Sequence, residues 1–457
     1  MTRADGNWLR FVATMIFLLW CYGCSAQGQK SLASKGLTPK KAMSNLSVDT
    51  QGVIDPISFG AMGDGVTDDT QAFQKALSLC SNRGMTCVVP AGKSFLITAP
   101  LYVWGKANLV GDKLQGSIVF DGGGSPYLMN VGISGPQRLE PPFSGEISGI
   151  AFKVVGGEGG RTLYFWRTVG AVITKNHFEF GQYRYSATSS GNDNNVVKNG
   201  FINCIRKDIT ITDNTIVATA NYDGSEGIGL GSFDGALIMN NKVTGVGDDP
   251  IGIHFSENVR ILRNDLSSVD GRLFVVNSKH VEIANNRHER IRSPKDGIFY
   301  TGISLLYIGF EDYLKANSYS APTDVQIHHN TLYYPVGSVD QGAAIYLYGP
   351  RDVTVENNEV INDSSDVVAS AVYILPASFK EPWKDPDKID SRNVARVHNV
   401  SVIGNTSLGK HPLPMRMTGN CDGYAGKVVI RDNLASDFNF YCDNVIADGN
   451  KRTQSPR

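Results

Sequence analysis

A short hydrophobic and polar motif recurs over more than half of the chain: an apolar residue is followed three positions later by asparagine. Its nine copies are Ile173/Asn176, Ile211/Asn214, Ile238/Asn241, Ile261/Asn264, Ile283/Asn286, Ile327/Asn330, Val355/Asn358, Val402/Asn405 and Ile430/Asn433. The shortest interval, from Asn264 to Asn286, is 22 residues, and the longer intervals add insertions to that unit. A repeat this short cannot bury its own apolar face, so its copies must stack on one another. The pattern predicts a solenoid of short β-strands and turns.

The repeated asparagines are expected to have a structural role. Asparagine tolerates the left-handed backbone conformation of a tight bend, and its side-chain amide can hydrogen-bond to the equivalent amide on the next coil. We therefore expect one row of stacked asparagines, each in a left-handed bend, along one corner of the solenoid.

A second apolar pattern lies eight and ten residues before the apolar residue of the motif. It comprises Ile228, Leu230, Ile251, Ile253, Leu273, Val275, Ile345 and Leu347. Because side chains alternate across a strand, these residues should fill the core, and the positions between them should point to solvent. Those outward positions are Gly229, Gly231, Gly252, His254, Phe274, Val276, Tyr346 and Tyr348. Small residues let a sugar chain approach the backbone, and tyrosine rings are suited to stack on sugars, so this face is a predicted substrate floor.

Composition agrees with a single elongated repeat domain. A chain of 457 residues is long enough for several ordinary domains, but it has 49 glycines, only 19% charged residues and no long helical pattern. The formal net charge of −1 offers no basic surface for nucleic acid or anionic lipid. A neutral or weakly polar partner fits this surface better.

The first residues have the anatomy of a secretory signal. Arg3 and Arg10 precede an apolar run from Phe11 to Trp20, and small residues end the segment at Ala26. The run is too short to span a bilayer, so no transmembrane segment is predicted. Cys24 is an alternative lipid-anchor site. The protein is expected to be secreted or periplasmic.

The domain organisation follows from these patterns. We expect a signal peptide over residues 1–26, a flexible polar lead-in over 27–53, one solenoid domain over 54–450 and a short tail over 451–457.

The seven cysteines suit an oxidising compartment. Cys80 and Cys87 flank a turn, and Cys421 and Cys442 lie about one coil apart, so both pairs are predicted disulfides. Cys204 is then the odd thiol. No group of cysteines and histidines has the spacing of a zinc site.

The segment from Phe59 to Phe73 predicts a strand, a glycine-rich turn and then a helix, with Asp68 or Asp69 as its N-terminal cap. The expected apolar face of the helix is Ala72, Phe73, Ala76, Leu77 and Leu79. The first strands of the solenoid are then expected at 88–92 and 96–97. A helix here would cover the end of the solenoid, where core and unpaired backbone are otherwise exposed.

This opening segment resembles that of pectate-lyase superfamily proteins, and with the asparagine repeats the resemblance covers roughly residues 54–450. It implies an all-β fold, a right-handed single-stranded parallel β-helix with a short N-terminal capping helix, and a carbohydrate ligand. That superfamily includes hydrolases, lyases and tailspikes, so the resemblance alone implies no particular reaction.

Carboxylates gather at one level of the predicted solenoid. One repeat position is occupied on three successive coils by Glu226, Asp249 and Gly271. The adjacent position is occupied on the same coils by Ser225, Asp248 and Asp270. Adjacent coils of a parallel sheet lie about 4.8 Å apart. Carboxylates one or two coils apart therefore bracket the separations of about 5 to 9.5 Å that retaining and inverting glycosidases use. Crowded carboxylates also raise one another's proton affinity, which suits one of them to act as an acid.

The segment 247–253 resembles the Gly-Asp-Asp segment of polygalacturonase-type hydrolases, and 221–224 is similar to that family's Asn-Thr-Asp-Gly segment. By this resemblance, Asp223 and Asp248 help to activate the attacking water, Asp249 is the general acid, and hydrolysis inverts the anomeric centre.

The chain departs from that family at two places. Asp270-Gly271-Arg272 stands where the hydrolases carry Gly-His-Gly, and the segment 290–292 is only a weak match to their later substrate clamp. A lyase or epimerase is therefore an open alternative. Arg272, pointing outward beside His254 and the acids, would then either neutralise the carboxylate of a uronate or act as the base for its C5 proton, and the acids could hold Ca²⁺ to do the neutralising.

The sequence thus predicts a polysaccharide-active enzyme, with a hydrolase slightly ahead of a lyase or epimerase, and a non-catalytic glycan-binding solenoid as the alternative. The candidate catalytic residues are Asp223, Asp248, Asp249 and Asp270. The candidate substrate-binding residues are Glu226, His254, Arg272, Tyr346 and Tyr348. No metal ligand and no cofactor is predicted, except Ca²⁺ for a lyase, and no particular oligomeric state is predicted. A catalytic role explains three carboxylates in register, which a binding module does not need.

Overall fold

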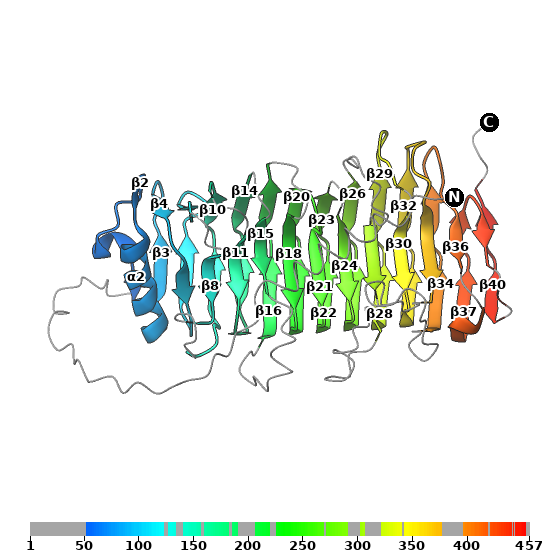
Figure 1. Cartoon of the computed structure of the whole chain (residues 1–457), viewed down its shortest axis with the longest axis horizontal. Helices are drawn as coiled ribbons and strands as arrows, with labels where there is room; N and C mark the ends of the chain where they lie inside the picture. Colours follow the sequence, from blue (N-terminus) through cyan, green and yellow to red (C-terminus); the bar gives the residue numbers. More distant parts are fainter. Residues whose placement is uncertain are drawn as a thin grey trace, which may run out of the picture.

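The structure is a long solenoid in which each coil adds one strand to each of three parallel sheets (Figure 1). The computed structural model describes residues 52–122, 127–133, 140–156, 160–181, 185–190, 206–219, 225–268, 271–290, 302–306, 321–340, 342–376, 396–418, 421–440, 442 and 444–453. The expected signal peptide, Cys24 and Cys204 lie outside these residues. No helix in the described part of the chain is long and apolar enough to cross a membrane.

Within the described residues the three sheets have 15, 14 and 12 strands, and we name them sheets A, B and C. Sheet A contains β1 (Val53–Ile54), β3 (Thr86–Val89), β6 (Asn108–Gly111), β9 (Glu146–Ser148), β12 (Thr168–Val169), β13 (Val172–Thr174), β16 (Arg206–Thr212), β19 (Asp234–Met239), β22 (Glu257–Leu262), β25 (Lys279–Ala284), β28 (Thr323–His328), β31 (Arg351–Glu356), β34 (Val397–Ile403), β37 (Tyr424–Arg431) and β40 (Val445–Asp448).

Sheet B follows sheet A along each coil. It contains β2 (Asp64–Asp68), β4 (Ser94–Ile97), β7 (Ser117–Phe120), β10 (Ala151–Val154), β14 (His177–Phe180), β17 (Thr215–Ala218), β20 (Lys242–Val246), β23 (Asp265–Ser268), β26 (Arg287–Arg290), β29 (Thr331–Tyr334), β32 (Glu359–Asn362), β35 (Thr406–Leu408), β38 (Leu434–Ala435) and β41 (Lys451–Arg452).

Sheet C completes the coil. It contains β5 (Leu101–Val103), β8 (Tyr127–Val131), β11 (Gly160–Phe165), β15 (Tyr185–Ser189), β18 (Glu226–Gly231), β21 (Ile251–His254), β24 (Arg272–Val276), β27 (Gly302–Leu306), β30 (Ala343–Tyr348), β33 (Ser370–Leu375), β36 (Met415–Met417) and β39 (Phe438–Asn439). The first strand begins at Val53, one residue before the expected solenoid domain of 54–450, and the last strand ends at Arg452, two residues beyond it.

The core lies inside the triangle of sheets, and the predicted inward residues of sheet C all belong to it. Ile228 pairs with Ile251, which pairs with Leu273, so one apolar residue stacks on the next from coil to coil. This confirms the alternation read from the sequence.

The asparagine row forms a continuous hydrogen-bonded ladder between sheets A and B. At Asn241, both the backbone N–H and the side-chain amide donate to Oδ1 of Asn264, at 2.9 and 3.0 Å. The same pattern joins all nine predicted asparagines and continues to Asn450. The row and its bonds are therefore confirmed.

One detail of that prediction is wrong, because the ladder asparagines do not adopt the left-handed conformation. The residue before each of them does, for example Asn240 (φ 56°) and Arg263 (φ 53°). The bend is made one residue earlier, which turns the following asparagine side chain inward, where its amide reaches the next coil.

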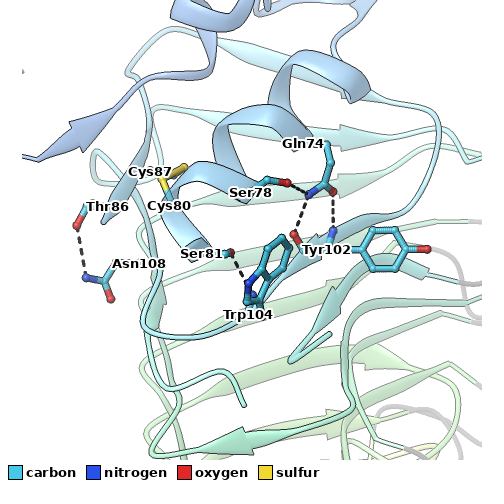
Figure 2. The surroundings of a disulfide bond; sticks show 9 residues. All are labelled: Gln74, Ser78, Cys80, Ser81, Thr86, Cys87, Tyr102, Trp104 and Asn108. Atoms are coloured by element: carbon cyan, nitrogen blue, oxygen red, sulfur yellow. Dashed lines mark hydrogen bonds between the residues drawn. A yellow bond between two sulfur atoms is a disulfide. The ribbon is translucent and has the colours of Figure 1, made fainter. Parts of the chain in front are cut away.

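The N-terminal end is covered by helix α2 (Thr70–Arg83), which buries Phe73, Ala76 and Leu77 against the core and confirms the predicted cap. Figure 2 shows how α2 also protects the edge strand β5. The Gln74 side chain donates to the Tyr102 carbonyl and accepts from its N–H, at 3.0 and 2.8 Å. The helix thus pairs backbone groups that the open edge of sheet C would otherwise expose.

The segment before α2 differs from the prediction. Pro56–Phe59 is a 3-10 turn, η1, and the strand begins later, at Asp64. Pro56 fixes its own φ and lacks an N–H, and Asp55 accepts from the N–H of Ile57, so a turn is favoured there. The Asp68 carboxylate accepts from the N–H of Thr70, at 3.0 Å.

Both predicted disulfides are present, Cys80–Cys87 and Cys421–Cys442. The first joins α2 to β3 in the first coil (Figure 2). The second starts in the 3-10 turn η3 (Cys421–Gly423) near the other end of the solenoid.

Candidate active site

The candidate site lies on the outer face of sheet C, over a row that is glycine on two successive coils. Ser189 pairs with Gly229, which pairs with Gly252 and then with Phe274. A Cβ on Gly229 would lie 3.0 Å from Oε2 of Glu226. A Cβ on Gly252 would lie 3.3 Å from Nε2 of His254 and 3.8 Å from Oδ2 of Asp249. Small residues here leave room for polar side chains to lie over the sheet.

Asp248 and Asp249 occupy the turn between β20 and β21, and the backbone fixes their register. The N–H of Asp248 donates to the Ser225 carbonyl at 2.9 Å, and the N–H of Gly227 donates to the Asp249 carbonyl at 3.0 Å. Asp248 therefore lies beside Ser225, and Asp249 lies beside Glu226, in the predicted register.

Gly271 supports this acidic pair from the following coil. A Cβ on Gly271 would lie 1.6 Å from the Asp248 carbonyl oxygen and 3.0 Å from the Asp249 nitrogen. Only glycine allows this approach, because any side chain would displace the peptide bond that joins the two aspartates.

Burial raises the pKa of Asp249 well above its ordinary value, and the charges of Asp248 and Glu226 raise it further against the opposing effect of Arg272. The residue is only 7% exposed. Burial also raises the pKa of Glu226, which accepts a hydrogen bond from Ser186 at 3.1 Å and lies near Arg161. The site therefore contains a carboxyl with a raised pKa beside Asp248, which is half-buried.

A buried cation borders the acids. Arg272 is 6% exposed, its Nε lies 3.7 Å from Oδ1 of Asp249, and its guanidinium carbon lies 4.1 Å from the centre of the Phe274 ring. Burial lowers the pKa of His254 to about 4, with a further contribution from Arg272. His254 is thus a neutral imidazole near neutral pH, and its ring meets the Phe274 ring edge-on at 5.4 Å.

The aromatic side chains are on the predicted face, but several of them do not point to solvent as expected. Phe274 and Tyr346 are 2% and 6% exposed, and Val276 is fully buried. They form a second apolar cluster outside sheet C, against which Tyr348 and Tyr373 are partly buried. The alternation identified the face correctly, whereas burial depends on what packs over that face. Tyr348 and Tyr373 are the more accessible rings.

The remaining predicted site residues have different outcomes. Asp223 and Asp270 lie outside the described residues. Arg290, the first residue of the weak clamp match, is buried and forms an ion pair with Asp340 at 3.1 Å, so it does not reach the outer face. Within the described part of the chain, no group of three or more His, Cys, Asp or Glu residues is arranged to hold a metal ion.

Sequence reasoning missed Arg161 and Ser186, which the structure places beside Glu226. Arg161 pairs with Ser186, which pairs with Glu226. Arg161 precedes its anchor Ile173 by twelve residues, the same count that separates Glu226 from Ile238. The same twelve-residue spacing could have identified Arg161. An insertion after β15 lengthens the coil between those of Arg161 and Glu226, so this spacing is absent there and the row is not continuous in the sequence.

Comparisons with known proteins support the architecture. Residues 202–375 match the family described as "Right handed beta helix region". In Arabidopsis thaliana, polygalacturonase ADPG1 is 57% identical over 42 residues, and the probable polygalacturonase At3g15720 is 54% identical over 46 residues. These segments cover 9% and 10% of this chain, and the chain spans only about a tenth of the length of each relative.

Among solved structures, the A-module of the Azotobacter vinelandii mannuronan C-5 epimerase AlgE6 superposes with a TM-score of 0.60. The superposition covers 88% of this chain and 100% of that module, at 15% sequence identity. At that identity the likeness concerns the fold alone. The fold is a right-handed parallel β-helix, as the sequence resemblance implied.

Proposed function

We propose that this protein is an exported polysaccharide-active enzyme, and that it is a glycoside hydrolase with Asp249 as its general acid. One observation carries the proposal: Asp249 is a buried carboxyl with a raised pKa beside half-buried Asp248, on a glycine floor. Glycosidic bond cleavage requires one carboxyl that donates a proton and a second carboxylate that accepts one or attacks.

In the proposed reaction, Asp249 donates its proton to the glycosidic oxygen of the leaving sugar, and Asp248 accepts a proton from the attacking water. Burial and the charge of Asp248 raise the pKa of Asp249, and Arg272 and Glu226 adjust it in opposite directions. The polygalacturonase resemblance of residues 247–253 supports inversion at the anomeric carbon, and it adds Asp223 as a second residue that activates water.

A lyase or epimerase is the second candidate, and His254 is the observation that favours it. Its imidazole is neutral near neutral pH, and the buried cation Arg272 lies near it. A neutral imidazole can remove the C5 proton of a uronate while a cation offsets the sugar carboxylate. Ca²⁺ is not part of this proposal, because no group of three or more His, Cys, Asp or Glu residues in the described part of the chain is arranged to hold a metal ion.

Export is supported by the signal-like segment that ends near Ala26 and by the two disulfides, which persist in oxidising compartments.

The decisive experiment incubates the protein with polygalacturonate, mannuronan and neutral glucans. Three products are followed: new reducing ends, ultraviolet absorbance of unsaturated uronate, and the uronate epimer ratio by NMR. Reducing ends without absorbance identify a hydrolase, and reducing ends with absorbance identify a lyase. A changed epimer ratio alone identifies an epimerase. Binding without any product overturns the enzyme proposal in favour of a glycan-binding solenoid.

A further inference from the structure

A group of buried polar side chains lies inside the solenoid next to the candidate site, toward the C-terminal ends of strands β23 and β26 of sheet B. We name it the polar corner, and it consists of Ser268, His288, Arg290 and Asp340. His288 interrupts an apolar column that the strand register defines as Phe152, Phe178, Ile216, Val243, Leu266, His288, Leu332 and Val360. In the neighbouring column, Val246 is followed by Ser268 and then by Arg290.

Polar residues at such positions are unfavourable unless their hydrogen bonds are made inside the protein. Apolar residues fill the same columns on the preceding coils, so the solenoid can be built without these polar ones. Their presence on two successive coils beside the acids suggests a task other than packing.

Ser268 and His288 form a chain of hydrogen bonds that ends at the candidate site. The Ser268 hydroxyl donates to the Gly271 carbonyl at 2.8 Å and lies 2.9 Å from Nε2 of His288. Burial lowers the pKa of His288 to about 4 against the opposing effect of a backbone hydrogen bond to Gly302, and the charge of Arg290 lowers it further, so the imidazole is neutral. The tautomer with its proton on Nε2 satisfies both bonds, because His288 then donates to Ser268 and Ser268 donates to Gly271.

The other half of the corner anchors the approach to β30. Nη1 of Arg290 lies 3.1 Å from Oδ2 of Asp340, and both side chains are buried. Oδ1 of Asp340 accepts from the N–H of Gly342, which immediately precedes β30.

Gly271 connects the polar corner to the acids. Its α-carbon lies so close to the peptide bond between Asp248 and Asp249 that no Cβ fits, and the next residue is Arg272. A shift of the Gly271 backbone must therefore move the peptide bond of the acidic pair, the Arg272 side chain, or both.

We propose that Ser268 and His288 are positioning residues of the candidate site: they hold Gly271 against the Asp248–Asp249 peptide bond and so fix the acidic pair relative to Arg272. The effect on turnover rests on the proposed function, whereas the effect on backbone order does not. Neither side chain is proposed to touch the substrate.

The test uses the full chain with His288→Leu and Ser268→Ala. Leucine suits the column because Leu266 and Leu332 are its neighbours, so we expect His288→Leu to keep the thermal midpoint of unfolding. Both variants should lower kcat about 10- to 100-fold, the loss typical of a misplaced catalytic group, and change KM less than about twofold. Amide hydrogen exchange at Asp248 and Asp249 should become faster.

Two variants provide matched controls. Ser268→Thr keeps the hydroxyl and has the shape of valine, which the preceding coil carries at this position, so it should restore kcat and slow exchange. Ser267→Ala removes the adjacent hydroxyl from the opposite face of β23 and should change neither.

Faster exchange together with lower kcat in both test variants supports the positioning role, and either quantity at the wild-type value overturns it. Failure of the proposed function is recognised separately, because either the wild type then forms no product or Asp249→Asn turns over substrate like the wild type. In that case hydrogen exchange at the acidic pair still decides whether the polar corner holds it.

Discussion

The asparagine ladder and the candidate site are two rows of buried polar groups stacked at the same coil spacing. In the ladder, each amide donates to one neighbour and accepts from the other, so identical residues satisfy one another from coil to coil. At the site, Glu226 and Asp249 lie on neighbouring coils; burial raises the pKa of both, and the charge of Asp248 raises both further. Repetition of an amide stabilises the solenoid, whereas repetition of a carboxylate destabilises the charged form of the site.

This difference teaches how a repeat protein can carry a reactive site. An amide has both donors and acceptors, so a stack of amides needs no other partner. A carboxylate only accepts, so stacked carboxylates need a proton or a nearby cation, and here Arg272 lies beside Asp249, whose pKa is raised. The candidate catalytic carboxyl thus lies where the equivalent residues of neighbouring coils do not satisfy one another's hydrogen bonds.

The largest effect should come from Asp249→Asn. The amide has nearly the same shape but cannot donate an acidic proton, so we expect turnover to fall about 10³-fold, within the range for general acid catalysis. The folded structure should be retained, because the substitution removes like-charge crowding. Turnover at saturating substrate and the thermal midpoint should be measured together. Wild-type turnover would exclude Asp249 as the acid.

In the ladder, Asn264→Ala should lower stability without a specific effect on the chemistry. It removes the acceptor for the N–H of Asn241 and the donor to the Ile238 carbonyl, both buried. Leaving such groups unsatisfied should lower the free energy of unfolding by about 3 kcal/mol, measured by denaturant titration. Asn450→Ala is the matched control, because its ladder position is only half-buried and water can replace the lost bonds. Equal losses for both variants would contradict the importance of burial.

The pH dependence of stability should also distinguish the carboxylates of the candidate site from the amides of the asparagine ladder. A carboxyl whose pKa is higher in the folded than in the unfolded chain stabilises the fold below the unfolded pKa, and that contribution is lost as the pH rises through the folded pKa. The thermal midpoint of Asp249→Asn should therefore equal that of the wild type near pH 3 and exceed it increasingly toward neutral pH. The exposed Asp265→Asn on sheet B is the control. A constant difference across this range would show that the Asp249 pKa is not raised.

The smallest expected effect concerns the aromatic residues beyond the acids. Tyr348 is stacked on Tyr346 at 6.2 Å, and its register neighbours are Leu306 and Leu375, so Tyr348→Leu fits the existing pattern. Loss of a stacking ring should raise KM about fivefold, equivalent to about 1 kcal/mol, and leave kcat unchanged. Tyr333→Leu, on the outer face of sheet B, should change neither constant. An unchanged KM for Tyr348→Leu would remove this residue from the substrate surface.

Sequence periodicity predicted those parts of the molecule in which one coil repeats the next. The ladder, the inward residues of sheet C and the register of Glu226 with Asp249 all follow from a constant count between anchors and from the need to bury apolar side chains. The N-terminal cap was predicted from its amphipathic pattern.

Features that depend on partners outside the repeat were not predictable in the same way. Alternation places Tyr346 on the outer face of sheet C, but it does not reveal that the side chain is buried there. Arg161 was missed because an insertion interrupts the count on the next coil. Hydrogen bonds that cross from one sheet to another, such as those of Gln74 to Tyr102, depend on the three-dimensional path of the chain.

The positions of the two disulfides have a consequence for how this molecule is expected to lose its structure. In a one-dimensional stack, a terminal coil has a neighbour on only one side, so unfolding starts most easily from the ends. Cys80–Cys87 and Cys421–Cys442 lie in the first and last parts of the stack. Each restricts the freedom that a detached terminal coil would gain. Resistance to fraying, and with it the lifetime of the folded chain in the presence of proteases, should therefore depend on the redox potential of the surroundings.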